Sequence, residues 1–93
     1  MLRFTWDPAK ALANLRKHDV GFLEAATAFS DPHSISIPDP DHSSPAEERG
    51  LLLGYSQQGR LLVIAHTAQG DEIRLINARL ATRPERETYE EDH

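Results

Sequence analysis

The spacing of apolar and polar residues changes along the chain, and these changes predict where its elements begin and end. Residues 2–6 (LRFTW) alternate and are rich in aromatic side chains, which predicts a short strand. Asp7 and Pro8 form a strong helix start, because Asp7 can accept from free N–H groups and proline suits the first helical position. The run to His18 and residues 22–29 repeat apolar residues at helical spacing. We expect two short helices joined as a hairpin.

The second predicted helix has a start signal of its own. Gly21 suits the N-cap position, and Glu24 follows three residues later, where a capping box has its acidic member. The segment Ser30-Asp31-Pro32 then ends the helix.

Strand-like periodicity dominates the second half of the chain. Four runs are predicted as strands: residues 34–37, 49–56, 60–67 and 72–79. The last three are joined by short connectors that contain glycine, which is typical of hairpins, so they should form an antiparallel meander. Residues 61–65 are apolar on both faces, so this strand should lie centrally and be covered by the helices on one side.

Two further segments complete the predicted fold. Residues 38–46 hold three prolines and no periodicity, which predicts a surface loop. Thr82 and Glu85 form a T-x-x-E capping box that opens a short helix to about Tyr89, and residues 90–93 are expected to fray. The order strand, helix, helix, four strands, helix indicates one α+β domain over the whole chain, with an antiparallel sheet packed by short helices.

Composition limits the possible classes of function. The 93 residues include no cysteine, which excludes disulfides and thiolate zinc sites. The chain has no signal-peptide pattern and no apolar run of about 20 residues, so we expect a cytoplasmic protein without a membrane segment. A net charge of −5 disfavours simple electrostatic binding of nucleic acid. Four arginines precede most of the acidic tail, however, and leave room for a local basic patch: Arg74, Arg79, Arg83 and Arg86.

Any catalysis must come from ordinary polar groups arranged across the sheet, because the common nucleotide-binding, metalloprotease and nucleophile motifs are absent. The most suggestive set combines arginines, which suit phosphate geometry, with a histidine and a carboxylate that can move protons. Its members are Glu48, Arg49, His66, Arg74, Arg79, Arg83 and Arg86. A structural interpretation stands beside this one. The arginines can pair with Glu72, Glu85 and Glu87, and His66 can be a hydrogen-bonded histidine on an apolar strand.

Alternation decides which of these arginines can act together. Along the last strand, Arg74 falls on the face with Ala78, and Arg79 falls on the opposite face. These two arginines are therefore not expected to project together from the strand. Arg83 and Arg86 stand three residues apart on the final helix and can share a surface.

Two other clusters carry weaker signals. The first could offer oxygen and imidazole ligands to a divalent metal: His33, Asp39, Asp41 and His42. Its spacing matches no known site, and solvated side chains in a loop are the favoured interpretation. The second shares one face of the first helix: Asn14, Lys17 and His18. It can contact an anionic partner or face solvent, and the solvent-facing alternative is favoured.

Five ordered motifs resemble a known family. They are F-T-W-D-x-x-K-x-x-x-N-x-x-K-H (Phe4–His18), V-x-F-x-E-A-A-x-x-F-x-D-P (Val20–Pro32), E-E-R (Glu47–Arg49), H-T (His66-Thr67) and R-L-I-N-A-R-x-A-T-x-x-E (Arg74–Glu85). Together they are similar to the BrnT family, the toxins of bacterial type II toxin–antitoxin pairs. The family usually has serine where this chain has Asn77, a larger polar residue.

The resemblance implies a RelE-like fold and an endoribonuclease that blocks translation, without metal or other cofactor. It also implies a BrnA-like antitoxin as partner, with operator DNA contacted only through that antitoxin, in a homodimer or a heterotetramer. The implied chemistry is attack of the ribose 2′-hydroxyl on the adjacent phosphate. A non-catalytic binding protein on the same fold, acting only through its antitoxin, is the alternative.

The resemblance supplies matching positions, and the roles given to them here, like the supporting place of the two helix arginines, are a hypothesis. The positions matching catalytic groups are Glu48, His66, Arg74 and Arg79, and those for RNA binding are Lys17, His18 and Arg49, supported by Arg83 and Arg86. The expected arrangement has Arg74 and Arg79 holding the phosphate, while His66 or Glu48, facing them across the sheet, moves protons.

Overall fold

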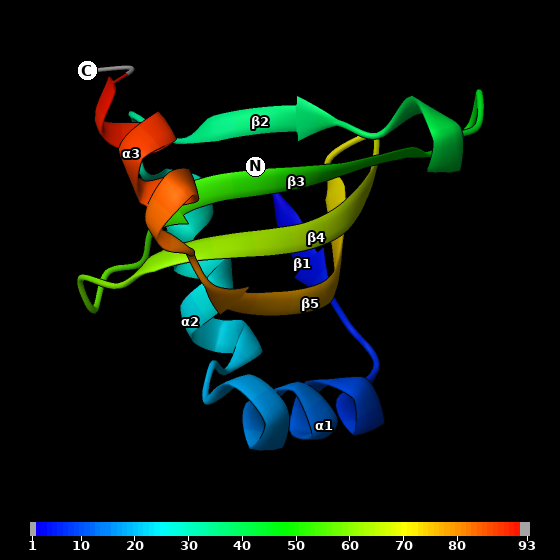
Figure 1. The fold of residues 1–93 in the computed structure, drawn as a ribbon. Coiled ribbons are helices and arrows are strands. Elements are labelled where there is room, and N and C mark those ends of the chain that lie inside the picture. Colours follow the sequence, from blue (N-terminus) through cyan, green and yellow to red (C-terminus); the bar gives the residue numbers. More distant parts are fainter. Residues whose placement is uncertain (1, 92–93) are drawn as a thin grey trace.

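The computed structural model describes residues 2–91, which form a five-stranded sheet and three α-helices (Figure 1). The strands are β1 (Arg3–Thr5), β2 (Ile35–Pro38), β3 (Glu48–Tyr55), β4 (Leu61–Gln69) and β5 (Glu72–Leu80). The helices are α1 (Pro8–His18), α2 (Phe22–Thr27) and α3 (Arg83–Glu91), with short 3-10 turns at Ala28–Ser30 and Pro40–His42. The α+β class and the predicted order of elements are confirmed.

The strands lie in the order β1-β5-β4-β3-β2, so the apolar strand β4 is central, as predicted. The pairs β2–β3, β3–β4 and β4–β5 are antiparallel. The edge strand β1 differs from this expectation, because it pairs in parallel with β5. The long connection through α1 and α2 lets the chain start at one edge of the sheet and resume at the other.

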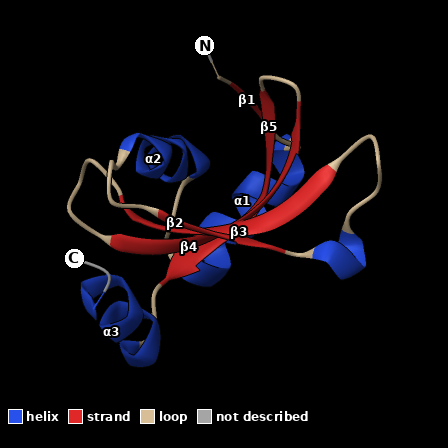
Figure 2. Cartoon of the chain, turned by 90° about the horizontal axis from the view of Figure 1, so that it is seen from above, coloured by secondary structure: helices blue, strands red, loops and turns tan. Residues whose placement is uncertain are grey.

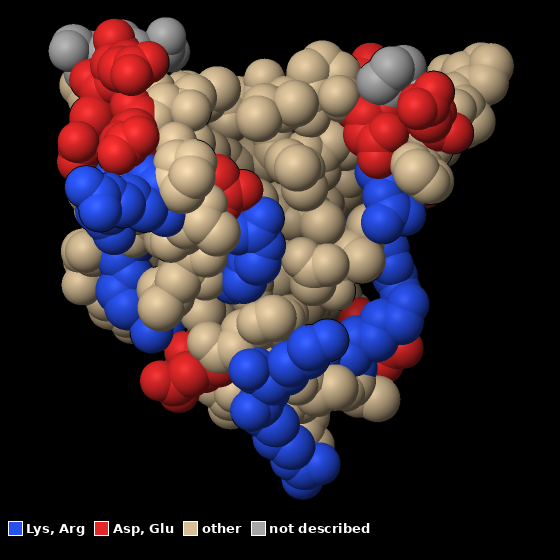
Figure 3. All heavy atoms as spheres, in the orientation of Figure 1, with Lys and Arg blue, Asp and Glu red and all other residues tan. Residues whose placement is uncertain are grey.

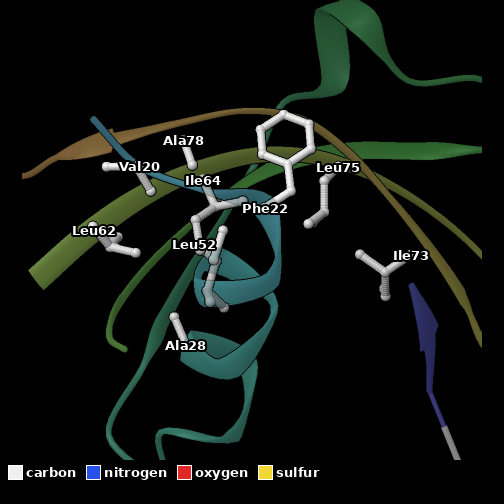
Figure 4. Packing of buried hydrophobic residues seen from close by; sticks show 10 residues of the cluster. Val20, Phe22, Ala28, Leu52, Leu62, Ile64, Ile73, Leu75 and Ala78 are labelled. Atoms are coloured by element: carbon white, nitrogen blue, oxygen red, sulfur yellow. The ribbon is translucent and has the colours of Figure 1, made fainter. Parts of the chain in front are cut away.

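Helices lie on both sides of the sheet: Figure 2 shows α2 on one face and α3 on the other. We call these the α1/α2 face, because core residues between the end of α1 and α2 pack on it, and the α3 face; α1 itself runs along the β5 edge of the sheet (Figure 1). The main core lies on the α1/α2 face and includes Val20, Phe22, Leu62, Ile64 and Leu75 (Figure 4). A smaller cluster on the α3 face joins Tyr89 to buried side chains of β3 and β4. Within residues 2–91 no helix is long and apolar enough to cross a membrane.

All three helices begin where predicted, and Gly21 is the N-cap of α2. The predicted side-chain caps form at α1 and α3 only. Asp7 accepts a hydrogen bond from the Ala9 N–H at 2.9 Å and begins α1. The Glu85 carboxylate accepts from the Thr82 N–H at 2.8 Å, which completes the predicted capping box of α3. The described part of α3 reaches Glu91, so positions 90 and 91 are helical rather than frayed, and residues 92–93 lie outside the described residues.

Glu24 does not cap α2, contrary to prediction. Its carboxylate is buried and accepts hydrogen bonds from Ser56 Oγ at 2.8 Å and from Arg60 Nε at 2.9 Å. The Arg60 hydrogen bond outweighs the cost of burial and lowers the pKa of Glu24. The residue therefore ties α2 to the β3–β4 hairpin.

Asn14 is also buried, so the prediction that it faces solvent with Lys17 and His18 is wrong. Its Nδ2 donates to the carbonyls of Val20 and Ala78, each at 2.9 Å, and its Oδ1 accepts from the Ala78 N–H at 3.0 Å. The amide thus pairs with the backbone of β5 as a neighbouring strand would. It joins α1 to the part of β5 that β1 does not reach.

Candidate active site

A bulge in the β4–β5 pair decides which β5 side chains share a face. Ala65 is opposite Asn77, whereas His66 is opposite Leu75, so Ile76 has no partner in the register. The extra residue shifts the alternation by one position. Arg74, opposite Thr67, and Arg79, opposite Val63, consequently both lie on the α3 face. The prediction that these two arginines do not project together is wrong for this reason.

A third arginine lies on the same face. Arg49 of β3 is opposite Thr67, which in turn is opposite Arg74, so the three residues form a row across β3, β4 and β5. Two strand spacings put the backbones of the two arginines about 10 Å apart. The residues between them are small, since Thr67 and Ala65 line the middle of this surface and are buried.

This part of the α3 face is hollowed. A hollow of about 370 Å³ is lined by Arg49, Ala65, Asn77 and Arg79, together with Asp39 and residues of β2 and β3. Figure 3 shows this side of the molecule, with cationic side chains at the left, at the right, at the bottom and near the centre, where an acidic group lies beside one of them. Further acidic side chains gather at the two upper corners. A basic surface therefore exists on a protein whose net charge is −5.

Arg79 is already paired within the molecule. Its Nη1 and Nη2 donate to the two carboxylate oxygens of Glu85 at 2.7 and 2.9 Å, and Nη1 also donates to the Leu80 carbonyl at 3.3 Å. The hydrogen bonds to Glu85 raise the pKa of Arg79, and the same contact with Arg79 lowers the pKa of Glu85 to about 2. Both groups are therefore charged at any physiological pH.

His66 and Glu48 lie on the opposite side of the sheet. His66 is opposite Gly50, and Glu48 is opposite Ala68, which places both side chains on the α1/α2 face beyond the reach of α2. They line a hollow of about 420 Å³ together with Ser43 and Arg49. Because the two residues are diagonal neighbours on adjacent strands, their Cβ atoms are about 7–8 Å apart.

Gly50 keeps this hollow open. A Cβ atom at this position would stand 2.9 Å from the carbonyl oxygen of Ile37 in the neighbouring strand β2. The glycine therefore allows the close approach of β2, and it leaves space directly opposite the imidazole of His66.

The surroundings of His66 favour a neutral ring. The ring packs edge-on against Phe29 with centroids 5.0 Å apart, and Nδ1 lies 3.2 Å from the Ile64 carbonyl. Burial lowers the pKa of His66 below its usual 6.5. A carbonyl only accepts hydrogen bonds, so Nδ1 carries the proton and Nε2 is left as a base.

The sheet separates the two sets of candidates, and this corrects the expected arrangement. Arg74 and Arg79 lie on the α3 face, whereas His66 and Glu48 lie on the α1/α2 face, so one phosphate cannot contact both sets. Arg49 is the exception among them, because it lines both hollows.

The remaining candidates are spread more widely. Lys17 and His18 lie at the end of α1 and line a hollow of about 230 Å³ with Lys10 and Asn77. Asn77 also lines the hollow on the α3 face, so the two cationic regions meet at this residue.

The two arginines of α3 both have partners. The pair of Arg83 and Glu87 is exposed, with Nε 3.4 Å from the carboxylate and the Arg83 side chain 90% accessible. Arg86 Nη1 donates to the Tyr55 hydroxyl at 3.0 Å. The alternative interpretation, in which the arginines pair with other side chains of the protein, thus applies to Arg79 and Arg83, which pair with carboxylates. It also applies to Arg86, whose partner is a hydroxyl.

The loop residues suggested as metal ligands do not converge. Within residues 2–91 no group of three His, Asp or Glu side chains is placed to hold a metal ion. Asp39 Oδ2 instead lies 2.8 Å from His42 Nδ1 as an exposed pair within the loop.

Comparison with known proteins agrees with the fold. The chain resembles the crystal structure of the Brucella abortus ribonuclease toxin BrnT, with a TM-score of 0.63 and 16% identity. The match covers 89% of this chain and 100% of the other. A search of curated proteins by sequence finds no match. The model of the ribonuclease toxin BrnT of type II toxin–antitoxin systems matches residues 6–85.

The chain belongs to the BrnT family. It is accordingly a ribonuclease toxin of the type II toxin–antitoxin class, as the motifs predicted. The matched span of the BrnT model includes every candidate residue except Arg86.

Sequence reasoning missed the features that arrange the BrnT-like site. Strict alternation gave no sign of the bulge at Ile76, and the pattern around Glu24 is that of a helix cap. One signal was available for Asn14: a polar residue between Ala11 and His18 falls on the flank of α1 that packs on the sheet.

Proposed function

We propose that this BrnT-family protein is a metal-independent endoribonuclease whose catalytic centre is the hollow beside His66. The observation that carries the proposal is the set of groups lining this hollow: a base, a carboxylate and a cation, namely His66, Glu48 and Arg49. Among the described residues that line the hollow on the α3 face there are arginines, an amide and the carboxylate of Asp39, but no histidine.

The proposed chemistry is transesterification within RNA. His66 Nε2 removes the proton of a ribose 2′-hydroxyl, whose oxygen forms a bond to the adjacent phosphorus while the bond to the 5′-oxygen breaks. Arg49, whose side chain leaves β3 on the α3 face but which lines both hollows, reaches over from there and neutralises charge that develops on the phosphoryl oxygens. Glu48 stabilises the imidazolium, which then returns the proton to the departing 5′-oxygen. The products carry a 2′,3′-cyclic phosphate and a 5′-hydroxyl.

Arg74 and Arg79 have a different part in this proposal, which is to bind phosphates of the same RNA away from the scissile bond. The hollow that includes Asn77 continues the cationic surface to Lys17 and His18 at the end of α1. Arg83 and Arg86 on α3 flank this path in a supporting role. Several weak phosphate contacts are what an acidic protein needs to hold RNA.

The partner we propose is a BrnA-like protein antitoxin, with operator DNA reached only through it. Membership of a type II toxin family supports a protein antitoxin. Exposed apolar side chains support a partner that covers them, because Trp6 and the accessible leucines Leu12, Leu15 and Leu23 line one hollow between α1 and α2. A heterotetramer and a homodimer are both compatible with such a surface. RNA as substrate makes the cytoplasm the expected compartment.

The test uses purified protein and a labelled single-stranded RNA. Cleavage that persists in EDTA and yields 2′,3′-cyclic phosphate ends is expected, and added antitoxin should abolish it. Induced expression should arrest growth. Intact RNA together with tight antitoxin binding would favour the alternative, a non-catalytic member of the family. Activity lost on chelation would contradict metal independence.

A further inference from the structure

We propose that Glu85 is a positioning residue, which holds Arg79 so that one edge of its guanidinium faces an RNA phosphate on the α3 face. The inference rests on the proposed function, since it takes RNA as the ligand of this surface. It concerns a carboxylate that the catalytic scheme does not use.

Arg79 keeps two N–H donors that are not used within the described part of the molecule. A guanidinium has five N–H groups in one plane. Two are donated to Glu85 and one to the Leu80 carbonyl. No described residue accepts from the remaining two, the Nε–H and the outer N–H of Nη2. These two lie on the same edge of the plane and form a fork that matches two phosphate oxygens.

Glu85 is itself held in one place by the start of α3. Its Oε1 also accepts from the Thr82 N–H at 2.8 Å and from Thr82 Oγ1 at 3.0 Å, at the start of α3. The far end of the helix is attached to the fold by Tyr89, whose hydroxyl donates to Asp31 Oδ2 at 2.7 Å. A helix held at both ends gives the carboxylate one position, and the carboxylate gives Arg79 one orientation.

A hollow lies beside Arg79. The residue lines the hollow of about 370 Å³ with Arg49 and Asn77, which both carry N–H donors. Arg74 lies on the same face of β5, opposite Thr67 of the neighbouring strand β4. The hollow also has one carboxylate, Asp39, and its Oδ2 is engaged by His42 Nδ1. Donors thus predominate around a space large enough for a phosphate group.

The RNA affinity of a Glu85→Gln variant distinguishes positioning from a simple effect of charge, because the two predict opposite changes. Glu85→Gln removes a negative charge beside an RNA-binding surface, so simple electrostatics predicts tighter binding. Positioning predicts weaker binding, because an amide oxygen can accept from only one arm of Arg79. Glutamine is also accepted at the last position of a capping box, so the substitution leaves the start of α3 intact.

The experiment measures the affinity of the protein for a 2′-O-methyl oligoribonucleotide, which cannot be cleaved, and then kcat and KM on cleavable RNA. Arg79→Ala should weaken binding about tenfold or more, as the loss of a charged hydrogen bond does. Glu85→Gln should weaken binding and raise KM by roughly three- to tenfold, with kcat unchanged, because a misplaced contact loses part of its value.

The matched control is Glu87→Gln, which makes the same charge change on the same helix but at the exposed partner of Arg83. It should leave binding unchanged or slightly tighter. A second control, Thr88→Ala, removes a hydroxyl of the same helix that donates to the Pro84 carbonyl at 3.1 Å and keeps the contacts given for Glu85. It should leave RNA binding and KM unchanged.

Each outcome bears on the inference. If Glu85→Gln binds RNA as tightly as the parent or more tightly, or if Arg79→Ala has no effect, the inference is overturned. If the parent binds RNA in the expected manner but cleaves none, the proposed function fails while the positioning of Arg79 stands. Melting curves of all four variants show whether each is folded.

Discussion

The two faces of the central strand β4 carry side chains with different roles. On the α1/α2 face, Leu62 and Ile64 belong to the main core, and the strand then presents His66 where the helices no longer cover the sheet. On the α3 face, Leu61 and Val63 pack beneath α3, and Thr67 lies between two arginines. The first face places one proton-transfer group at the margin of a core. The second places fixed positive charges around a shallow hollow.

This contrast shows why sharing a sheet does not amount to sharing a site. Successive side chains of a strand point to opposite faces of the sheet. Two residues that are neighbours in the sequence can therefore be unable to contact the same ligand. His66 and Thr67 are consecutive, yet the first lines the hollow with Glu48 and the second lies in the row of Arg49 and Arg74. We therefore expect substitutions on the two faces to change different kinetic constants.

The largest expected effect separates the two faces directly. His66→Asn should lower kcat for RNA cleavage by roughly 10²–10⁴-fold, because the general base is lost while a donor remains at the position of Nδ1, near the Ile64 carbonyl. Arg74→Ala should mainly raise KM. The measurement is steady-state kinetics on one RNA, with Arg3→Ala, an exposed arginine paired with Asp71, as the control. If Arg74→Ala lowers kcat as much as His66→Asn is expected to, the catalytic centre lies on the α3 face instead.

The second effect concerns stability and the helix that backs the α1/α2 face. Asn14→Ala should lower the free energy of unfolding by roughly 2–4 kcal/mol, because it leaves the backbone groups of Ala78 and the carbonyl of Val20 unpaired in the interior. Urea denaturation measures this. Lys17→Ala, on the exposed side of the same helix, is the control and should change stability little. Equal stabilities of the two variants would contradict the role given to Asn14.

A third prediction uses pH to tell the faces apart. Burial lowers the pKa of His66 below 6.5, so cleavage at pH 7 should already lie on its plateau and fall as the solution becomes more acidic than that pKa. The pair on the α3 face responds in a lower range. Arg79 lowers the pKa of Glu85 from 4.5 to about 2, so its stabilising contribution is complete above pH 4.5 and is lost as the pH falls towards 2.

Two measurements check these ranges. A pH–rate profile gives the first, and it should lose its acidic limb if His66 is not the base. Acid unfolding of Glu85→Gln against the parent gives the second. The variant should be less stable at pH 7, and its stability should depend less on pH between 4.5 and about 2. Parallel acid-unfolding curves would show that Glu85 gains nothing from Arg79.

The smallest expected effect concerns the attachment of α3. Tyr89→Phe removes the hydrogen bond to Asp31 and keeps the edge-on contact with Tyr55, whose ring centroid is 5.2 Å away. Asp31 retains the Tyr55 N–H at 2.8 Å. The free energy of unfolding should fall by about 1 kcal/mol. A thermal melt measures this, and a change in kcat would contradict the view that α3 serves only the surface on its own face.

The sequence by itself determined the elements of this protein and its family. Periodicity, Asp7-Pro8 and the Thr82–Glu85 capping box are local signals, so they predicted the strands, the helices and the class of fold. The ordered motifs predicted the BrnT family, which the family match confirms. Only the tertiary structure decided which side chains meet. The bulge at Ile76 places Arg74 on the same face as Arg79. Glu24 pairs with Arg60 instead of capping α2. Pairing between distant strands sets these positions, and no local pattern records that register.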